Sequence, residues 1–124
     1  MDSKDFVAAI ECNVRSAAIE DTIANLKEPP GRRVLPEVRA RSDWYNGLSE
    51  ESAAYVNSAI ATAVHAAIFG VLAALDGARK IVDGEGHFEL TYVADERVLL
   101  NPQSINLYEL LRPADLPPPR RASP

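Results

Sequence analysis

Cysteine is nearly absent from this sequence, with Cys12 as the single example among 124 residues. No disulfide can therefore form within the chain, and a reducing compartment suits it. Cys12 falls in a helical segment and is expected to be a buried, inert thiol. The first residues, Met1 to Asp5, lack the basic and then apolar order of a signal peptide. Together these features predict a cytoplasmic protein.

Aromatic residues are also few: one tryptophan, four tyrosines and three phenylalanines. The hydrophobic fraction of 47% relies heavily on alanine instead. Alanine buries little surface, so the larger aliphatic side chains must be concentrated in a few places to form a core.

Motifs for catalysis, metal binding or nucleotide binding are missing as well. The stretch Asp83–Gly86 lacks the twelve-residue pattern of a calcium loop, and it does not precede a helix that could cradle phosphate. His87 and Glu89 share one face of a predicted strand, but zinc requires three or four ligands. We therefore predict no catalytic residue, no metal site and no cofactor.

Positive charge is in deficit, because 13 basic residues face 18 acidic ones and the net charge is −5. This balance argues against nucleic acid as a partner and is compatible with a basic protein partner. Residues 59–75 carry no charge and approach the length of a membrane span. The segment contains Thr62 and His65 and is flanked by acidic residues, so we predict a buried helix of a soluble protein and no membrane.

The chain is short enough for a single domain, which we place at residues 1–112, followed by an extended or disordered proline-rich tail at 113–124. Asp2 or Ser3 can cap a first helix that reaches Lys27. Its apolar face changes side: the first half presents Phe6, Val7, Ile10, Val14 and Ala17, and the second presents Ile19, Ile23 and Leu26. Two surfaces must cover this helix, or it must bend near residues 17–18.

A connector rich in proline and arginine follows at residues 28–42. Pro36 can open a short helix through Tyr45. Trp44 and Tyr45 are expected to anchor this segment to the core, although they could also belong to a binding surface.

The dominant element is a long alanine-rich helix, predicted from Ser49 to Lys80. Ser49 is a suitable N-cap, and Glu50 and Glu51 complement the helix dipole. One sector of this helix is aliphatic. Beside it small residues recur at alternating spacings of four and three, a heptad seam that permits close approach of another helix, either the first helix or a second copy: Ala59, Ala63, Ala66, Gly70, Ala73 and Gly77.

The third sector of the long helix is chemically the most varied. It carries Tyr55, His65 and Phe69, which could line a ligand site with His65 as acid, base or ligand. Asp76 is eleven residues from His65, or about 16 Å along a helix, so these two side chains cannot meet directly. A solvated or simply packed His65 is the plainer alternative.

The sequence pattern in the last third of the domain predicts two strands and a short helix. His87–Val93 alternates, with Phe88, Leu90 and Tyr92 on the apolar face, and a turn leads to a second strand at Arg97–Asn101. Ser104 can cap a short helix from Ile105 to Leu111. The predicted fold is α+β: a long central alanine-rich helix packed with an N-terminal helix, a two-stranded antiparallel hairpin and a short C-terminal helix.

The middle of the chain also carries a set of short motifs over roughly residues 28–112. They are Trp44-Tyr45, Leu48-Ser49-Glu50-Glu51, Phe69-Gly70-Val71-Leu72, Leu75-Asp76-Gly77, Leu99-Leu100-Asn101 and Leu107-Tyr108-Glu109-Leu110-Leu111. With these motifs the chain resembles a small bacterial family of unknown function. The resemblance implies no activity, cofactor or catalytic residue, because the motifs describe packing and capping.

These patterns favour a non-enzymatic protein-binding or regulatory module, homodimeric or with a protein partner, and by analogy inhibitor-like or immunity-like. The alternative is a small-ligand-binding protein or enzyme with a cleft between the central helix and the hairpin, lined by Tyr55, His65 and Phe69. A third hypothesis gives the basic connector, residues 32–41, an anionic partner.

Overall fold

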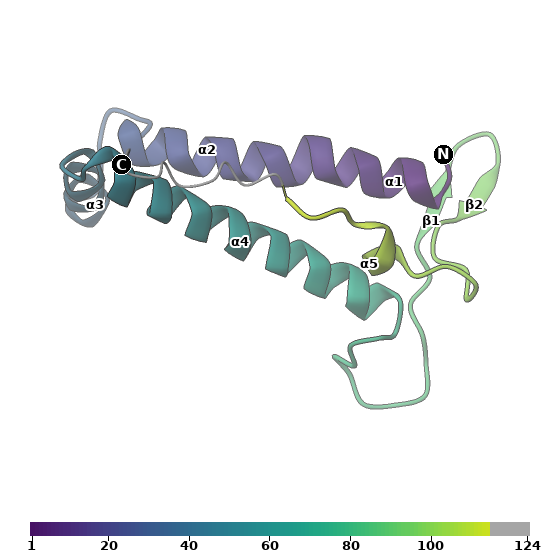
Figure 1. Cartoon of the computed structure of the whole chain (residues 1–124). Helices are drawn as coiled ribbons and strands as arrows, with labels where there is room; N and C mark the ends of the chain where they lie inside the picture. Colours follow the sequence, from purple (N-terminus) through teal and green to yellow (C-terminus); the bar gives the residue numbers. More distant parts are fainter. Residues whose placement is uncertain (115–124) are drawn as a thin grey trace, which may run out of the picture.

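The computed structural model describes residues 1–114. It has the predicted α+β architecture, in which two long helical arms are joined at one end and spread at the other (Figure 1). The elements are α1 (Ser3–Ile10), the π-helical turn η1 (Glu11–Arg15), α2 (Ser16–Lys27), α3 (Pro36–Asn46), α4 (Glu50–Leu75), β1 (Thr91–Val93), β2 (Arg97–Leu99) and α5 (Leu107–Leu110). The predicted tail lies, from residue 115 onward, outside the described residues.

The first arm is the continuous run of α1, η1 and α2. A capping box opens it: the Asp2 carboxylate accepts from the Asp5 backbone N–H at 2.8 Å, and the Asp5 carboxylate accepts from the Asp2 N–H at 3.2 Å. The change of apolar face occurs at η1, ahead of the predicted position at residues 17–18. A π-turn adds one residue to a helical turn, and this rotates all later side chains around the axis. Cys12 lies in this turn and is exposed, contrary to the prediction of a buried thiol.

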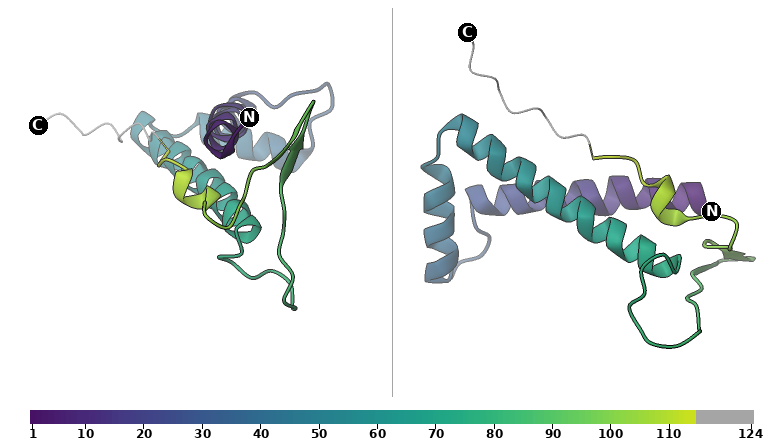
Figure 2. Two further views of the ribbon diagram at one scale, coloured as in Figure 1. Left: turned by 90° about the vertical axis from the view of Figure 1, so that its right-hand side faces the viewer. Right: turned by 60° about the horizontal axis from the view of Figure 1, so that its bottom comes forward.

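Helix α3 lies across the joined end of the two arms, as both views in Figure 2 show. Pro36 occupies its first turn, as predicted. Tyr45 is buried and donates its hydroxyl hydrogen to Asn57 Oδ1 on α4 at 2.8 Å. Trp44, in contrast, is 56% exposed and does not anchor the segment.

The second arm, α4, starts where the sequence predicts, because the Ser49 side chain accepts from the Ser52 N–H at 3.1 Å. It ends at Leu75, five residues before the predicted end at Lys80. Gly77 adopts a φ of +78° there, and the N–H groups of Ala78 and Arg79 both turn back to the Ala73 carbonyl. This left-handed glycine closes the helix.

Helix α4 is also less buried than predicted. It is long and apolar enough to cross a membrane by length and composition, and within the protein only 28% of its most apolar 18-residue window is buried. A core helix of a soluble domain normally hides most of such a stretch. Much of the apolar surface of α4 therefore faces outward.

The hairpin is shorter than predicted. Only three pairs form, Thr91 with Leu99, Tyr92 with Val98 and Val93 with Arg97. Residues 87–90 are held instead by the Asn101 side chain, which accepts from the Leu90 N–H at 2.7 Å and donates to the Phe88 and Leu75 carbonyls, both at 2.9 Å. Of the predicted apolar face, Leu90 is partly buried, whereas Phe88 and Tyr92 are exposed.

The core lies in the gap between the spread ends of the arms, where α5 is inserted (Figure 1). Val7, Leu72, Leu107 and Leu111 are buried together there. Helix α5 covers four residues instead of the predicted Ile105–Leu111. Ser104 does not cap it; the Asp76 carboxylate accepts from the Tyr108 N–H at 3.0 Å. Ser3 fixes the chain after the hairpin by donating to the Leu100 carbonyl at 2.6 Å.

Candidate functional site

Glu11 and Arg15 are the two charged residues that the η1 turn buries. Glu11 is 4% exposed and Arg15 8% exposed, and Glu11 Oε2 lies 3.9 Å from Arg15 Nη2. The turn is maintained by an i→i+5 bond from the Ser16 N–H to the Glu11 carbonyl, which also accepts from Ser16 Oγ at 3.1 Å. Turns of this kind are frequent at functional sites, so the surroundings of these two residues are the first place to seek chemistry.

The Glu11 carboxylate is satisfied by Arg112, which lies 101 positions away. It accepts from the Arg112 backbone N–H at 2.7 Å, from Nε at 3.2 Å and from Nη2 at 2.9 Å. Burial alone would raise the pKa of Glu11. The hydrogen bonds from Arg112, together with the charges of Arg112 and Arg15, outweigh burial and hold this pKa below its usual value.

Arg15 extends the network to the second arm. Its Nη1 donates to the Arg112 carbonyl at 2.6 Å and contacts His65 Nδ1, on α4, at 3.1 Å. A guanidinium can only donate, so Nδ1 of His65 is the acceptor and the ring proton is on Nε2. Glu11, Arg15, His65 and Arg112, named here the η1 cluster, thus connect both arms to the segment that follows α5.

The η1 cluster has the properties of a clamp. Its short contacts hold one protein group against another, and the backbone of Arg112 uses both its N–H and its carbonyl. Within residues 1–114 no group of three or more His, Cys, Asp or Glu side chains is placed to hold a metal ion. The geometry therefore supports positioning of the chain between the arms.

The three residues predicted to line a ligand site do not converge. Tyr55 is exposed near the start of α4, and His65 is turned onto Arg15. Phe69 packs its ring edge-to-face on Tyr108 of α5, with centroids 5.5 Å apart. The hairpin is attached beside Ser3 and Leu75, at the far end of α4 from Tyr55 (Figure 1).

The small-residue seam divides into two halves. Ala59, Ala63 and Ala66 are exposed, whereas Gly70 and Ala73 are buried and Gly77 lies in the turn after the helix. Gly70 is covered by the chain's own Arg79: a Cβ added there would lie 2.6 Å from Arg79 Nη1. The exposed half remains without a covering helix in the described part of the chain.

An open apolar groove adjoins this seam. Two hollows of about 290 and 370 Å³ lie on either side of Val71 and share Ala67, Val71 and Leu75. Val71 is itself 61% exposed. We name this surface the Val71 groove; it is lined mainly by Phe6, Ile10, Val14, Ala67, Ile68, Val71, Leu72, Ala74, Leu75, Ile81 and Phe88.

Neither the η1 cluster nor the Val71 groove was predicted from the sequence. The i,i+4 spacing of Glu11 and Arg15 was visible, but Arg112 carries no signal that it would reach them. The groove was hidden because its residues were read as core. Comparisons with known protein families, with curated proteins and with solved structures found no match to this chain.

Proposed function

We propose that this chain is a non-enzymatic protein-binding module that assembles as a homodimer through the Val71 groove. One observation carries the proposal, namely the excess of exposed surface. The chain exposes 9219 Å², whereas a compact monomer of 13.5 kDa exposes about 6,500 Å².

An excess of exposed surface remains after an upper-limit area is subtracted for residues 115–124. Counting residues 115–124 at the exposure of an unfolded chain removes about 1,600 Å², and about 1,500 Å² of excess still remains for the rest. A standard interface takes about 800 Å² from each partner. The surplus is therefore large enough for a stable dimer.

A second copy is the occupant that the chemistry favours. The groove is an apolar surface between two helices, and burial of such surfaces drives association of helical bundles. A symmetric pairing would place Val71 near the axis and cover the apolar walls of the groove with the same walls of the second copy. A lipid surface fits less well, because α4 also carries Asn57 and His65, whose side chains are hydrogen-bonded to Tyr45 and Arg15.

The test is sedimentation of the full chain over a range of concentrations. We expect a species of twice the 13.5 kDa chain mass. Val71→Glu places a charge in the groove and should give a monomer with unchanged helical circular dichroism, because residue 71 is exposed in the single chain. Val93→Glu is the matched control, since Val93 on β1 is 58% exposed and outside the groove, and it should remain dimeric.

Two results would overturn the proposal. The first is a wild-type monomer at about 500 µM, far above the concentration at which a standard interface dissociates. The second is flotation of the wild-type chain with phosphatidylcholine vesicles that Val71→Glu abolishes, which would make the occupant a membrane.

A further inference from the structure

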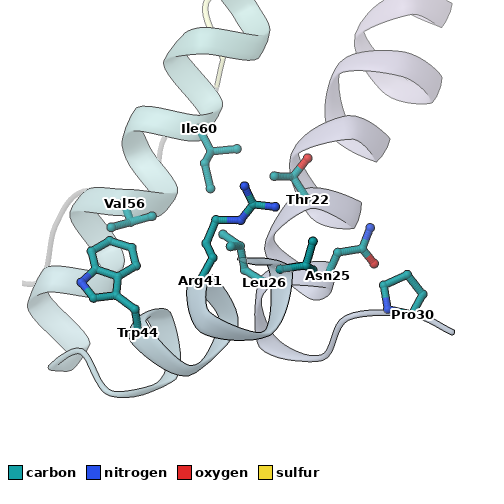
Figure 3. Close-up of a pocket in the computed structure, with 9 residues that line it drawn as sticks. Thr22, Asn25, Leu26, Pro30, Arg41, Trp44, Val56 and Ile60 are labelled. Carbon is teal, nitrogen blue, oxygen red and sulfur yellow. The ribbon is translucent and has the colours of Figure 1, made fainter. Parts of the chain in front are cut away.

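A separate hollow of about 580 Å³ lies at the joined end of the arms, between α2, α3 and α4. Val38 from α3 is one of its mostly aliphatic walls. Leu26 from α2 and Ile60 from α4 form others (Figure 3). Pockets that hold small molecules have volumes of about 300–1,000 Å³ and combine apolar walls with a few polar groups. This hollow has the size and the lining of such a pocket.

One charged group enters the apolar space. The guanidinium of Arg41 reaches from α3 to a position between Thr22 and Ile60, as Figure 3 shows. Within residues 1–114, Arg41 makes no ion pair and no hydrogen bond, and neither do the side chains of Thr22 and Asn25, which line the same hollow. Its five N–H donors are therefore available to a ligand.

The charge around the hollow points to an anion. Residues 27–42, from which Pro30, Val38 and Arg41 come, contain five basic and two acidic residues in a chain whose net charge is −5. This segment is locally basic, with a net charge of +3 from its five basic and two acidic residues, and it favours anions near Arg41.

The single guanidinium and the apolar lining of the hollow favour one type of anion over another. A phosphate would need several cationic or backbone donors for its oxygens, whereas a carboxylate is matched by one guanidinium fork. Trp44 stands at the rim beside Val56, with its indole 56% exposed, and offers a flat face to an aromatic ring (Figure 3). We propose that this hollow binds a small aromatic carboxylate, with Arg41 holding the carboxylate and Trp44 stacking on the ring.

This site is independent of the proposed dimer. Val56, at the hollow, and Val71, in the groove, are fifteen residues apart on α4, or about 22 Å along the helix. The monomeric Val71→Glu variant should therefore bind the carboxylate as the wild type does, so that either proposal can fail without the other.

The experiment uses 3-phenylpropionate as the probe and Trp44, the only tryptophan in the chain, as the fluorescent reporter. We expect saturable binding to the full chain with a midpoint below about 1 mM, as befits a ligand of this size. The neutral analogue 3-phenylpropanamide should bind at least about tenfold more weakly, because it cannot form the charged fork. Inorganic phosphate should compete poorly.

Arg41→Gln should weaken 3-phenylpropionate by at least about tenfold and leave the amide unchanged. The matched control is Arg39→Gln, an exposed arginine of the same helix that does not line the hollow, and it should bind as the wild type does. Equal losses in both variants would show general electrostatic attraction and overturn the site. Equal binding of acid and amide, strong competition by phosphate, or no saturation at about 10 mM would overturn it as well.

Discussion

Glu11 shows how one residue sets the conditions under which the fold holds. Its carboxylate is buried but remains ionised because Arg112 supplies three donors and Arg15 a further positive charge. The Arg112 side chain is 75% exposed, so solvent screens part of this attraction. What Glu11 contributes is mainly the attachment of the segment after α5 to the first arm.

The lowered pKa of Glu11 predicts how stability responds to acid. A carboxyl group whose folded-state pKa is depressed stabilises the protein above its unfolded pKa, near 4.5, and this contribution is lost as the pH falls through the folded-state value. Glu11→Gln should therefore lower the free energy of unfolding at pH 7 by about 2–3 kcal/mol, since one partner of a half-buried pair is removed. The difference from wild type should shrink below pH 4.5.

Urea unfolding of both proteins between pH 3 and pH 7 measures this difference. Glu20→Gln, on the exposed surface of α2, is the control and should track the wild type at every pH. A Glu11→Gln deficit that stays constant down to pH 3 would contradict the assignment of the ionised form.

At this scale the sequence reveals partners only when they are neighbours along a helix. Glu11 and Arg15 are four residues apart, and their pairing follows from helical geometry. His65 and Arg112 join them through tertiary packing, 50 and 97 positions from Arg15, and no local pattern encodes those distances. His65 was therefore recognised as the unusual residue of α4, but its partner and its tautomer were not.

Among the elements, the hairpin depends on one side chain more than on its own pairing. Asn101 bonds to the backbone of Phe88, Leu90 and Leu75, and so connects the two ends of the hairpin to the end of α4. A two-stranded hairpin is marginal in water without such support. Three strand pairs are sufficient here because Asn101 supplies the remaining attachment.

Asn101→Ala should cost about 2–3 kcal/mol of unfolding free energy, because two partly buried backbone groups and one exposed backbone group lose their partner. Urea unfolding measures the total, and hydrogen exchange at the Leu90 N–H should accelerate the most. Asn106→Ala removes a surface bond to Glu109 and should change stability by less than about 0.5 kcal/mol. Similar losses in the two variants would show that Asn101 is not the anchor.

The starts of the three long predicted helices carry local signals, whereas the starts of β1 and α5 do not. Asp2 and Ser49 signal a helix start through capping hydrogen bonds and Pro36 through its fixed φ, and each helix begins where that signal places it. The end of α4 was placed too late because apolar residues such as Ile81 continue the helical pattern past Gly77. The positive φ of Gly77 stops the helix. Because glycine adopts helical and left-handed φ values equally well, the residue type alone does not show whether the helix ends there.

For the whole molecule, the sequence predicted which helices and strands form but not the angle between the two helical arms. The seam predicted close packing of either the first helix or a second copy on α4; within the described chain the two arms spread and α5 enters the gap (Figure 2). The angle between two helices is decided by the side chains of a third element and by whatever covers the outer faces. The open Val71 groove is the consequence, and under the proposed dimer it makes stability depend on association.

That dependence gives a prediction for the molecule as a whole. If native chains are dimers and unfolded chains are monomers, mass action raises the Tm with protein concentration. Between about 5 and about 500 µM, the free energy per chain should rise by about 1.4 kcal/mol, which corresponds to about 5 °C in Tm for a chain of this length. Calorimetry of Val71→Glu should show a shift below about 1 °C, and Val93→Glu should follow the wild type. A wild-type Tm that does not move would mean that the groove faces water in solution, because burial of that surface on a second copy necessarily couples folding to concentration.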